Sequence, residues 1–383
     1  MRKLKGALSE IVSQADMVLL ALCVGATGFG LLLIASATHY TGSYRYIIVQ
    51  SAALVLGICG YAVFSLVDIE MVAKYWKWML GFNVILIALL RTPLGLVRGG
   101  NRAWLGADFL PVQIQPAELV KITFAILLAK QLSQLREKGD LKSFHSAAYV
   151  GAHLLALVGF YVLISGDVGS ALVFCAVFCA MALVAGLALR WFAAAFAVLG
   201  GGFAFLWFTD KLPTYMKKRF IVLFDHSFDP SNIGLQQTRS LNAIGSGRIW
   251  GQGLFHGIRT QSSYSSALPA RHTDFIFSVA GEELGMAGCI AIIIVLALIV
   301  FRCLYVARYA RSDMDRFVAV GMAGMLIFQT IENIGMCLFV MPVIGLTLPF
   351  FSYGGSSVLV TFCAMGLVSG IHKRSRPDWL RSN

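Results

Sequence analysis

A few ionisable side chains stand inside or beside long apolar runs, and their types suit acid–base chemistry. Asp274 is followed directly by the apolar residues 275–277. This setting disfavours an ionised carboxylate and should raise its pKa toward the range of a general base. Asp274 could instead cap the helix that follows it. Glu282 and Glu283 follow on the same apolar segment, and they need partners that lysines or arginines of neighbouring segments could supply.

A second group of polar residues lies between positions 115 and 170. Glu118 and Lys121 are three residues apart on a predicted helix that begins near Pro116, so their side chains can meet on one helix face. They either neutralise each other as an ion pair or line a polar cavity in which Lys121 binds an anionic ligand. Asp167 lies in a short turn where it can cap the next helix, and this role is compatible with a functional one.

The composition indicates that a membrane surrounds these groups. The chain has 383 residues, of which 58% are hydrophobic and 13% charged, and its mean hydropathy is +0.76. A soluble domain averages about 45–50% apolar and about 25% charged residues. The chain therefore has more apolar surface than a soluble enzyme of this size can bury. Ionisable groups at membrane depth are costly and usually functional.

Ten apolar runs are long enough to suggest membrane-spanning helices, since a bilayer core needs about 20 residues per helix. The predicted fold is an all-α polytopic membrane protein with a single domain over residues 1–383. One long extracytoplasmic loop, at about 209–274, joins spans seven and eight. The predicted spans are 17–35, 46–66, 76–90, 117–132, 145–164, 168–187, 191–208, 275–306, 317–339 and 348–371.

The basic residues predict the orientation. Of the 31 lysines and arginines in the chain, 18 fall at the two termini and in the loops on their side. Because short cytoplasmic loops are enriched in lysine and arginine, both termini should be cytoplasmic. The net charge of +12 therefore reflects topology and is not a signal for nucleic acid. The basic residues 217–219 of the long loop could hold lipid head groups or face water. The first apolar run is longer than the core of a signal peptide and favours an uncleaved span.

Irregular or polar sequence also interrupts the last two spans. Gln329, Glu332 and Asn333 form a polar island in span nine, and the stretch 341–357 contains two prolines and three glycines. Such irregular backbone is tolerated at membrane depth where it lines a cavity. The alternative is a kinked packing seam built on small residues.

Six motifs together resemble those of the SEDS family, the membrane proteins of the RodA, FtsW and SpoVE type. In chain order they read QPAELVKI at 115–122, SGDVGSAL at 165–172, AIGSGRIWGQG at 243–253, HTDFIFSVAGEELG at 272–285, NIGM at 333–336 and LPFFSYGGSS at 348–357. They occur in the family's order and cover nearly the whole chain. The form RHTDFIF and the spacing of the long loop are more similar to the RodA branch than to FtsW.

The resemblance implies a ten-span peptidoglycan glycosyltransferase of the bacterial cytoplasmic membrane. Such an enzyme polymerises lipid II into glycan strands at the outer membrane face, for cell-wall elongation and cell shape. A class B penicillin-binding protein, which cross-links the strands, is the implied partner. The family's essential aspartate matches Asp274. Its polar cavity matches Glu118, Lys121, Asp167 and Arg219.

Several positions depart from the family's pattern. Ala270 stands where the family usually has an acidic residue. Arg45 lies one helical turn before the family's arginine at span two, and Arg102 is displaced by one place after span three. The candidate phosphate-binding residues are therefore a set of five cations: Lys121, Arg45, Arg102, Arg219 and Arg271.

The implied reaction needs a base for a sugar hydroxyl and positive charge for a diphosphate leaving group. Asp274 is the expected base, and arginine can bind phosphate bidentately. A divalent cation could share that task, although the sequence contains no recognisable metal cage. A lipid II flippase or transporter is an alternative, because broken helices and charges at membrane depth suit transport. A non-catalytic scaffold that places a transpeptidase is a second alternative.

Overall fold

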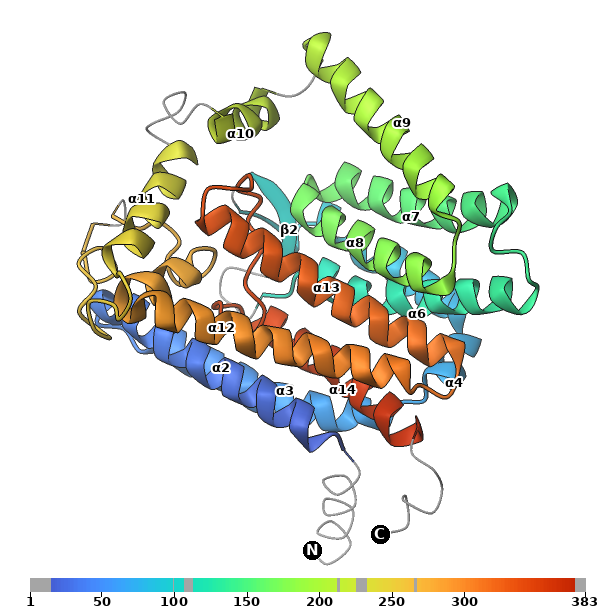
Figure 1. The fold of residues 1–383 in the computed structure, drawn as a ribbon, viewed down its shortest axis with the longest axis horizontal. Helices are drawn as coiled ribbons and strands as arrows, with labels where there is room; N and C mark the ends of the chain where they lie inside the picture. Colours follow the sequence, from blue (N-terminus) through green and yellow to red (C-terminus); the bar gives the residue numbers. More distant parts are fainter. Residues whose placement is uncertain are drawn as a thin grey trace, which may run out of the picture.

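The computed structural model describes residues 15–98, 100–106, 113–211, 214–224, 233–264 and 267–375. These residues form a bundle of long helices (Figure 1). Eight of the described helices are long and apolar enough to cross a membrane. They are α2 (Met17–Thr38), α3 (Arg45–Ser65), α7 (Phe144–Ser165), α8 (Val168–Ala185), α9 (Leu189–Phe208), α12 (Ile276–Arg308), α13 (Asp313–Cys337) and α14 (Gly355–Ser375).

Helices also occur at the two remaining predicted positions. The third predicted span corresponds to α5 (Trp76–Ala88), which has 13 residues and follows the short helix α4 (Ile69–Lys74). The fourth predicted span corresponds to α6 (Pro116–Glu137), which carries Glu118 and Lys121 within its first two turns. The structure thus agrees with a polytopic helical protein, and the total of ten spans stays a prediction.

Close helix packing at the centre of the bundle depends on small residues. Helix α14 packs along α3, while α13 packs between α12 and α8. A β-carbon on Gly366 of α14 would lie 2.5 Å from the carbonyl oxygen of Tyr61 of α3. Because backbones can approach this closely only where side chains are absent, glycine sets the spacing of these two helices.

The first and last described helices meet at one end of the bundle. The backbone N–H of Asp16 donates to Ser369 Oγ over 2.8 Å. Arg302 of α12 donates to both carboxylate oxygens of Asp16 over 2.8 and 3.1 Å. The start of α2 and the end of α14 therefore lie on the same side, as an even number of spans predicts. The cytoplasmic orientation of that side stays a prediction.

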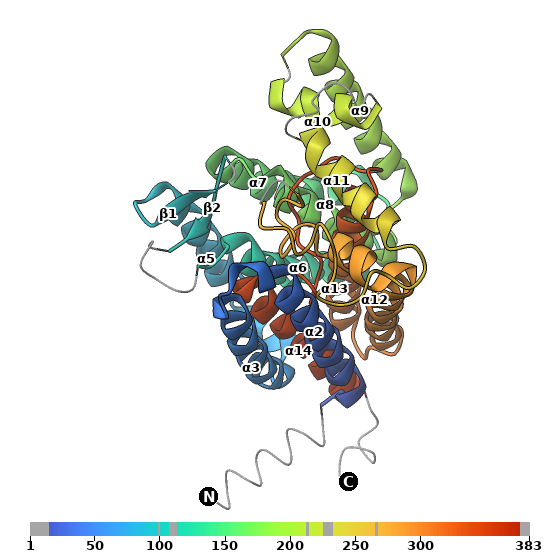
Figure 2. The same ribbon diagram turned by 90° about the vertical axis from the view of Figure 1, so that its left-hand side faces the viewer.

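The stretch predicted as a long loop contains two helices and ordered turns. Helix α9 extends away from the other spans (Figures 1 and 2), and none of its residues is buried. It is followed by α10 (Thr214–Phe224) and α11 (Ile233–Ser246), of which α11 packs against α12. The described segments 247–264 and 267–275 follow α11 and precede α12.

A short β-hairpin adds to the helical fold. Strands β1 (Gly95–Arg98) and β2 (Asn101–Leu105) pair antiparallel between α5 and α6. The sequence does not predict these strands, because strands of four and five residues are too short to show a clear alternation of apolar and polar side chains. The hairpin lies beside the turn that holds Asp167, since a β-carbon on Gly166 would lie 3.5 Å from Asn101 Oδ1.

Candidate active site

Asp274 lies in the turn that leads into α12. Helix α12 begins after Phe275 without a side-chain cap, so the alternative that Asp274 caps this helix is wrong. The carbonyl oxygen of Asp274 accepts a hydrogen bond from Asn333 Nδ2 over 2.8 Å, and the Cys337 thiol lies 3.8 Å from it. The side chain of Asp274 is partly exposed. Desolvation raises the pKa of its carboxyl to about 6, although a hydrogen bond with Thr273 opposes the shift.

The irregular segment between α13 and α14 borders the Asp274 carboxylate. A β-carbon on Gly345 would lie 3.8 Å from Asp274 Oδ2. The Ser352 hydroxyl donates to the carbonyl oxygen of Thr273 over 2.6 Å, and the Tyr353 N–H donates to that of His272 over 2.8 Å. The proline- and glycine-rich stretch therefore fixes the backbone on which Asp274 stands.

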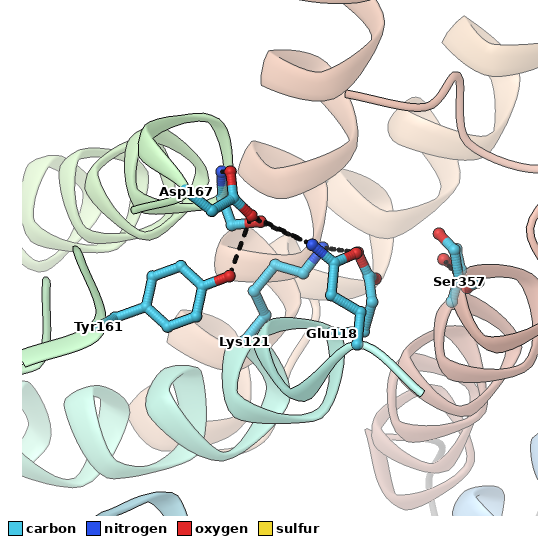
Figure 3. Close-up of polar contacts among 8 residues, drawn as sticks. Glu118, Lys121, Tyr161, Asp167 and Ser357 are labelled. Atoms are coloured by element: carbon cyan, nitrogen blue, oxygen red, sulfur yellow. Dashed lines mark hydrogen bonds and ion pairs between the residues drawn. The ribbon is translucent and has the colours of Figure 1, made fainter. Parts of the chain in front are cut away.

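Glu118 and Lys121 form the predicted ion pair. Lys121 Nζ lies 2.8 Å from Glu118 Oε1, and both side chains are buried. Pro116 begins α6 and places both residues on one face near its N-terminus. Figure 3 shows the two side chains turned toward each other beside Asp167. The pair is compatible with the alternative of a polar cavity wall, because a paired lysine keeps two further N–H donors.

Replacing Lys121 with methionine should destabilise the protein by about 3–5 kcal/mol, because it leaves the buried Glu118 carboxylate without its partner. The double variant Lys121→Met/Glu118→Met should recover most of this loss, since neither charge then remains buried. Thermal unfolding of both variants in detergent measures the difference. A double variant no more stable than Lys121→Met would contradict the expected coupling.

Asp167 is held by several donors at the start of α8. It caps this helix as predicted, because its Oδ1 accepts from the Ser170 N–H over 3.2 Å. Its Oδ2 accepts from the hydroxyls of Ser170 and Tyr161 over 2.7 and 2.9 Å, and from Gln115 Nε2 over 3.2 Å (Figure 3). The sequence did not predict Tyr161 and Gln115 as neighbours of Asp167, because no spacing signal links them to it.

One backbone segment joins the Asp167 cluster to Asp274. A β-carbon on Gly169 would lie 2.8 Å from the carbonyl oxygen of Ile344. The next residue, Gly345, has φ +75° and passes beside the Asp274 carboxylate. The ion pair of α6, the cap of α8 and Asp274 therefore lie at one end of the bundle. We call this end the polar end.

Glu282 and Glu283 bind the loop before α12 and form no salt bridge among the described residues. Glu282 accepts from the N–H groups of Arg259 and Thr260 and from the Thr260 hydroxyl, over 2.7–2.9 Å. Glu283 accepts from Ser36, Phe255, Gly257 and Gln261. The expectation that lysines or arginines of neighbouring segments pair with these carboxylates is wrong for the described residues, although Arg271 of the same loop interacts electrostatically with Glu282. N–H groups and hydroxyls of the loop donate to the two carboxylates instead, because the loop crosses α12 at the kink that this helix has at Gly285.

The predicted cations occupy different places. Arg271 is buried, and its Nη1 donates to the carbonyl oxygens of Arg259 and Thr260. Its guanidinium carbon lies 3.8 Å from the centre of the Tyr40 ring. In this arrangement Arg271 stabilises the loop, and a role in phosphate binding stays a prediction.

Three further predicted arginines lie on elements around the polar end. Arg45 is exposed at the start of α3, Arg102 is partly exposed on β2, and Arg219 lies on α10. Arg219 interacts electrostatically with Glu332 of α13, and so does Asp274. The Glu332 side chain is 2% exposed, and its two oxygens have no hydrogen-bond partner among the described residues. The polar island in span nine thus approaches Asp274.

Comparisons with known proteins agree with the motifs. The model of the FtsW, RodA and SpoVE family, described as "Cell cycle protein", matches residues 16–377. A probable peptidoglycan glycosyltransferase FtsW of Geobacter metallireducens is 32% identical over 372 residues, which cover 95% of this chain and 96% of that protein. Stage V sporulation protein E of Bacillus subtilis is 30% identical over 375 residues, which cover 95% of this chain and 98% of that protein.

Two solved structures share the fold along almost the whole chain. One belongs to work on a peptidoglycan synthase complex that coordinates polymerisation and cross-linking. It has a TM-score of 0.78 and 30% identity, and it covers 95% of this chain and 99% of its own. The other is the rod shape determining protein RodA of Thermus thermophilus, with a TM-score of 0.67, 27% identity and coverage of 95% and 98%. The chain therefore belongs to the family of FtsW, RodA and SpoVE.

Proposed function

We propose that this protein is a peptidoglycan glycosyltransferase that polymerises lipid II at the outer face of the bacterial cytoplasmic membrane. The observation that carries the proposal is the Asp274 carboxylate, which stands at the polar end of a membrane bundle, beside Gly345 and on a backbone held by Asn333. Burial raises the pKa of this carboxyl. Its raised pKa suits a general base. The name of the Geobacter metallireducens relative supports the same activity.

The reaction forms one glycosidic bond and breaks one bond to a diphosphate. Asp274 accepts the proton of the attacking sugar hydroxyl, and the hydroxyl oxygen forms a bond to the anomeric carbon of the other substrate. The bond between that carbon and the diphosphate oxygen breaks, and the diphosphate leaves with its electron pair. Lys121 and the arginines of the polar end supply positive charge for this leaving group.

Incubation of the purified protein with lipid II tests the proposal. Glycan strands should form, and gel or chromatographic analysis of the products would detect them. Relocated lipid without strands would favour the flippase alternative. A scaffold would yield no strands, and cells carrying its Asp274→Asn variant would still grow.

The rate should depend on the ionisation of Asp274. A base acts in its ionised form, so kcat/KM should fall as the pH drops through about 6, the raised pKa of the Asp274 carboxyl. At pH values above this range the acidic limb should level off. Polymerisation rates measured between about pH 4.5 and about pH 8 would show where this limb lies. An acidic limb centred near pH 4 would contradict the desolvated state of the base.

The partner in this proposal is a class B penicillin-binding protein, and both termini are cytoplasmic. The structural relative from a complex for polymerisation and cross-linking supports such a partner. The elongation role that the RHTDFIF motif favours stays a prediction, and the FtsW names of the curated relatives favour division. A fluorescent fusion that gathers at the division site would support division, and one spread along the side wall would support elongation.

A further inference from the structure

Three aromatic rings form a cluster next to the backbone of Asp274. Tyr46 of α3 lies 4.8 Å from His272 and 5.1 Å from Tyr353, measured between ring centres. His272 and Tyr353 lie 5.7 Å apart. We call Tyr46, His272 and Tyr353 the ring cluster. All three side chains are partly exposed, so the cluster is not simply part of the apolar core.

The ring cluster is tied rigidly to the candidate base. His272 precedes Asp274 by two residues, and its carbonyl oxygen accepts from the Tyr353 N–H over 2.8 Å. Gln50 of α3 donates to the carbonyl oxygen of Ser352 and accepts from the Gly354 N–H, each over 3.1 Å. The residues on both sides of Tyr353 are therefore fixed to α3, and the distance from the rings to Asp274 is set by the backbone.

Two arginines stand beside the ring cluster. Arg45 and Arg98 both interact electrostatically with Tyr353, and both are exposed. Arg98 lies on β1 and was not among the residues that the sequence singled out. Burial and the nearby Arg271 guanidinium lower the pKa of His272, which favours its neutral imidazole. The surface thus combines aromatic faces with cations that suit a negatively charged ligand.

We propose that the ring cluster, with Arg45 and Arg98, is a subsite that holds one sugar of a saccharide diphosphate against Asp274. This inference rests on the proposed function and names the part of the substrate that the subsite binds. A pyranose ring presents an apolar C–H face that packs on aromatic side chains, while the arginines bind the diphosphate. The rings hold the sugar beside Asp274, which takes the proton of its hydroxyl.

The test measures binding of lipid II by proteins that cannot turn it over. All variants carry Asp274→Asn and are reconstituted in nanodiscs, and a fluorescent lipid II is the probe. Tyr353→Leu keeps apolar bulk and removes the ring face, so it should weaken binding about tenfold, equal to about 1.4 kcal/mol. Tyr353→Phe keeps the ring and should bind like the parent. Tyr309→Ala is the matched control, because Tyr309 pairs with Tyr305 over 4.8 Å at the opposite end of α12.

Steady-state kinetics of proteins that keep the wild-type Asp274 provide the second readout. Tyr353→Leu should raise KM about tenfold and leave kcat within about twofold, as expected for a contact made equally in the ground and transition states. Wild-type binding by Tyr353→Leu would overturn the subsite while leaving the proposed function intact. If Tyr353→Phe binds lipid II as weakly as Tyr353→Leu does, the subsite is also overturned, because the Tyr353 hydroxyl would then be the binding group. A parent that does not bind lipid II would overturn both proposals.

Discussion

Replacing Asp274 with asparagine is expected to lower lipid II polymerisation by about 10²–10⁴-fold, the usual contribution of a positioned acid or base. Asparagine has nearly the same shape but cannot accept the hydroxyl proton. The backbone contacts of residue 274 with Asn333 and Cys337 use its carbonyl oxygen, so they survive the substitution. The measurement is the initial rate of glycan formation by purified protein at saturating lipid II.

The loss should come from chemistry and not from unfolding. The midpoint of thermal unfolding of Asp274→Asn should therefore stay close to that of the wild type. Asp315→Asn is the matched control, since Asp315 is a buried carboxylate on α13 that faces Arg374, and neither residue touches the polar end. Full polymerisation by the Asp274→Asn protein would remove this residue from the mechanism.

Replacing Glu283 with alanine is expected to destabilise the protein by about 3 kcal/mol or more. The carboxylate is fully buried. It accepts from the Ser36 hydroxyl over 2.5 Å, from Gln261 Nε2 over 2.9 Å and from two loop N–H groups. Each buried donor left without an acceptor costs about 1–3 kcal/mol. The loop 251–261 should then detach from α2 and α12.

Two measurements follow this change. The midpoint of thermal unfolding in detergent should fall, and trypsin should cut faster in the loop, which contains Arg259. Glu137→Ala serves as the control, because Glu137 is exposed at the end of α6. If Glu283→Ala unfolds at the wild-type temperature and its loop resists trypsin, the carboxylate is not what fastens the loop.

Local interactions were predictable from the sequence. The ion pair of Glu118 and Lys121 follows from their spacing of three on one helix, and the cap by Asp167 follows from its place before α8. Long apolar runs predicted the spanning helices, because a helix that crosses a bilayer core must be long and predominantly apolar. The hairpin β1–β2 escaped prediction, since its pairing is set by the two strands together and by neither alone.

Contacts between distant segments were not predictable in this way. Ser36 and Glu283, which are 247 positions apart, meet only because α2 packs on α12. The sequence suggested a lysine or arginine for that carboxylate, and a folded loop supplied the donors. Sequence spacing likewise says nothing about the meeting of Tyr46, His272 and Tyr353, which come from three separate segments.

The sequence by itself determined that this protein is a helical membrane protein of the FtsW, RodA and SpoVE type, with Asp274 as the carboxylate to test. Those conclusions depend on composition and on motifs, which are properties of the chain. Only the tertiary structure decided what surrounds Asp274: the backbone at Gly345, the amide of Asn333 and the ring cluster. The physical reason is that desolvation and hydrogen bonding act over a few ångströms, and packing alone brings distant residues that close.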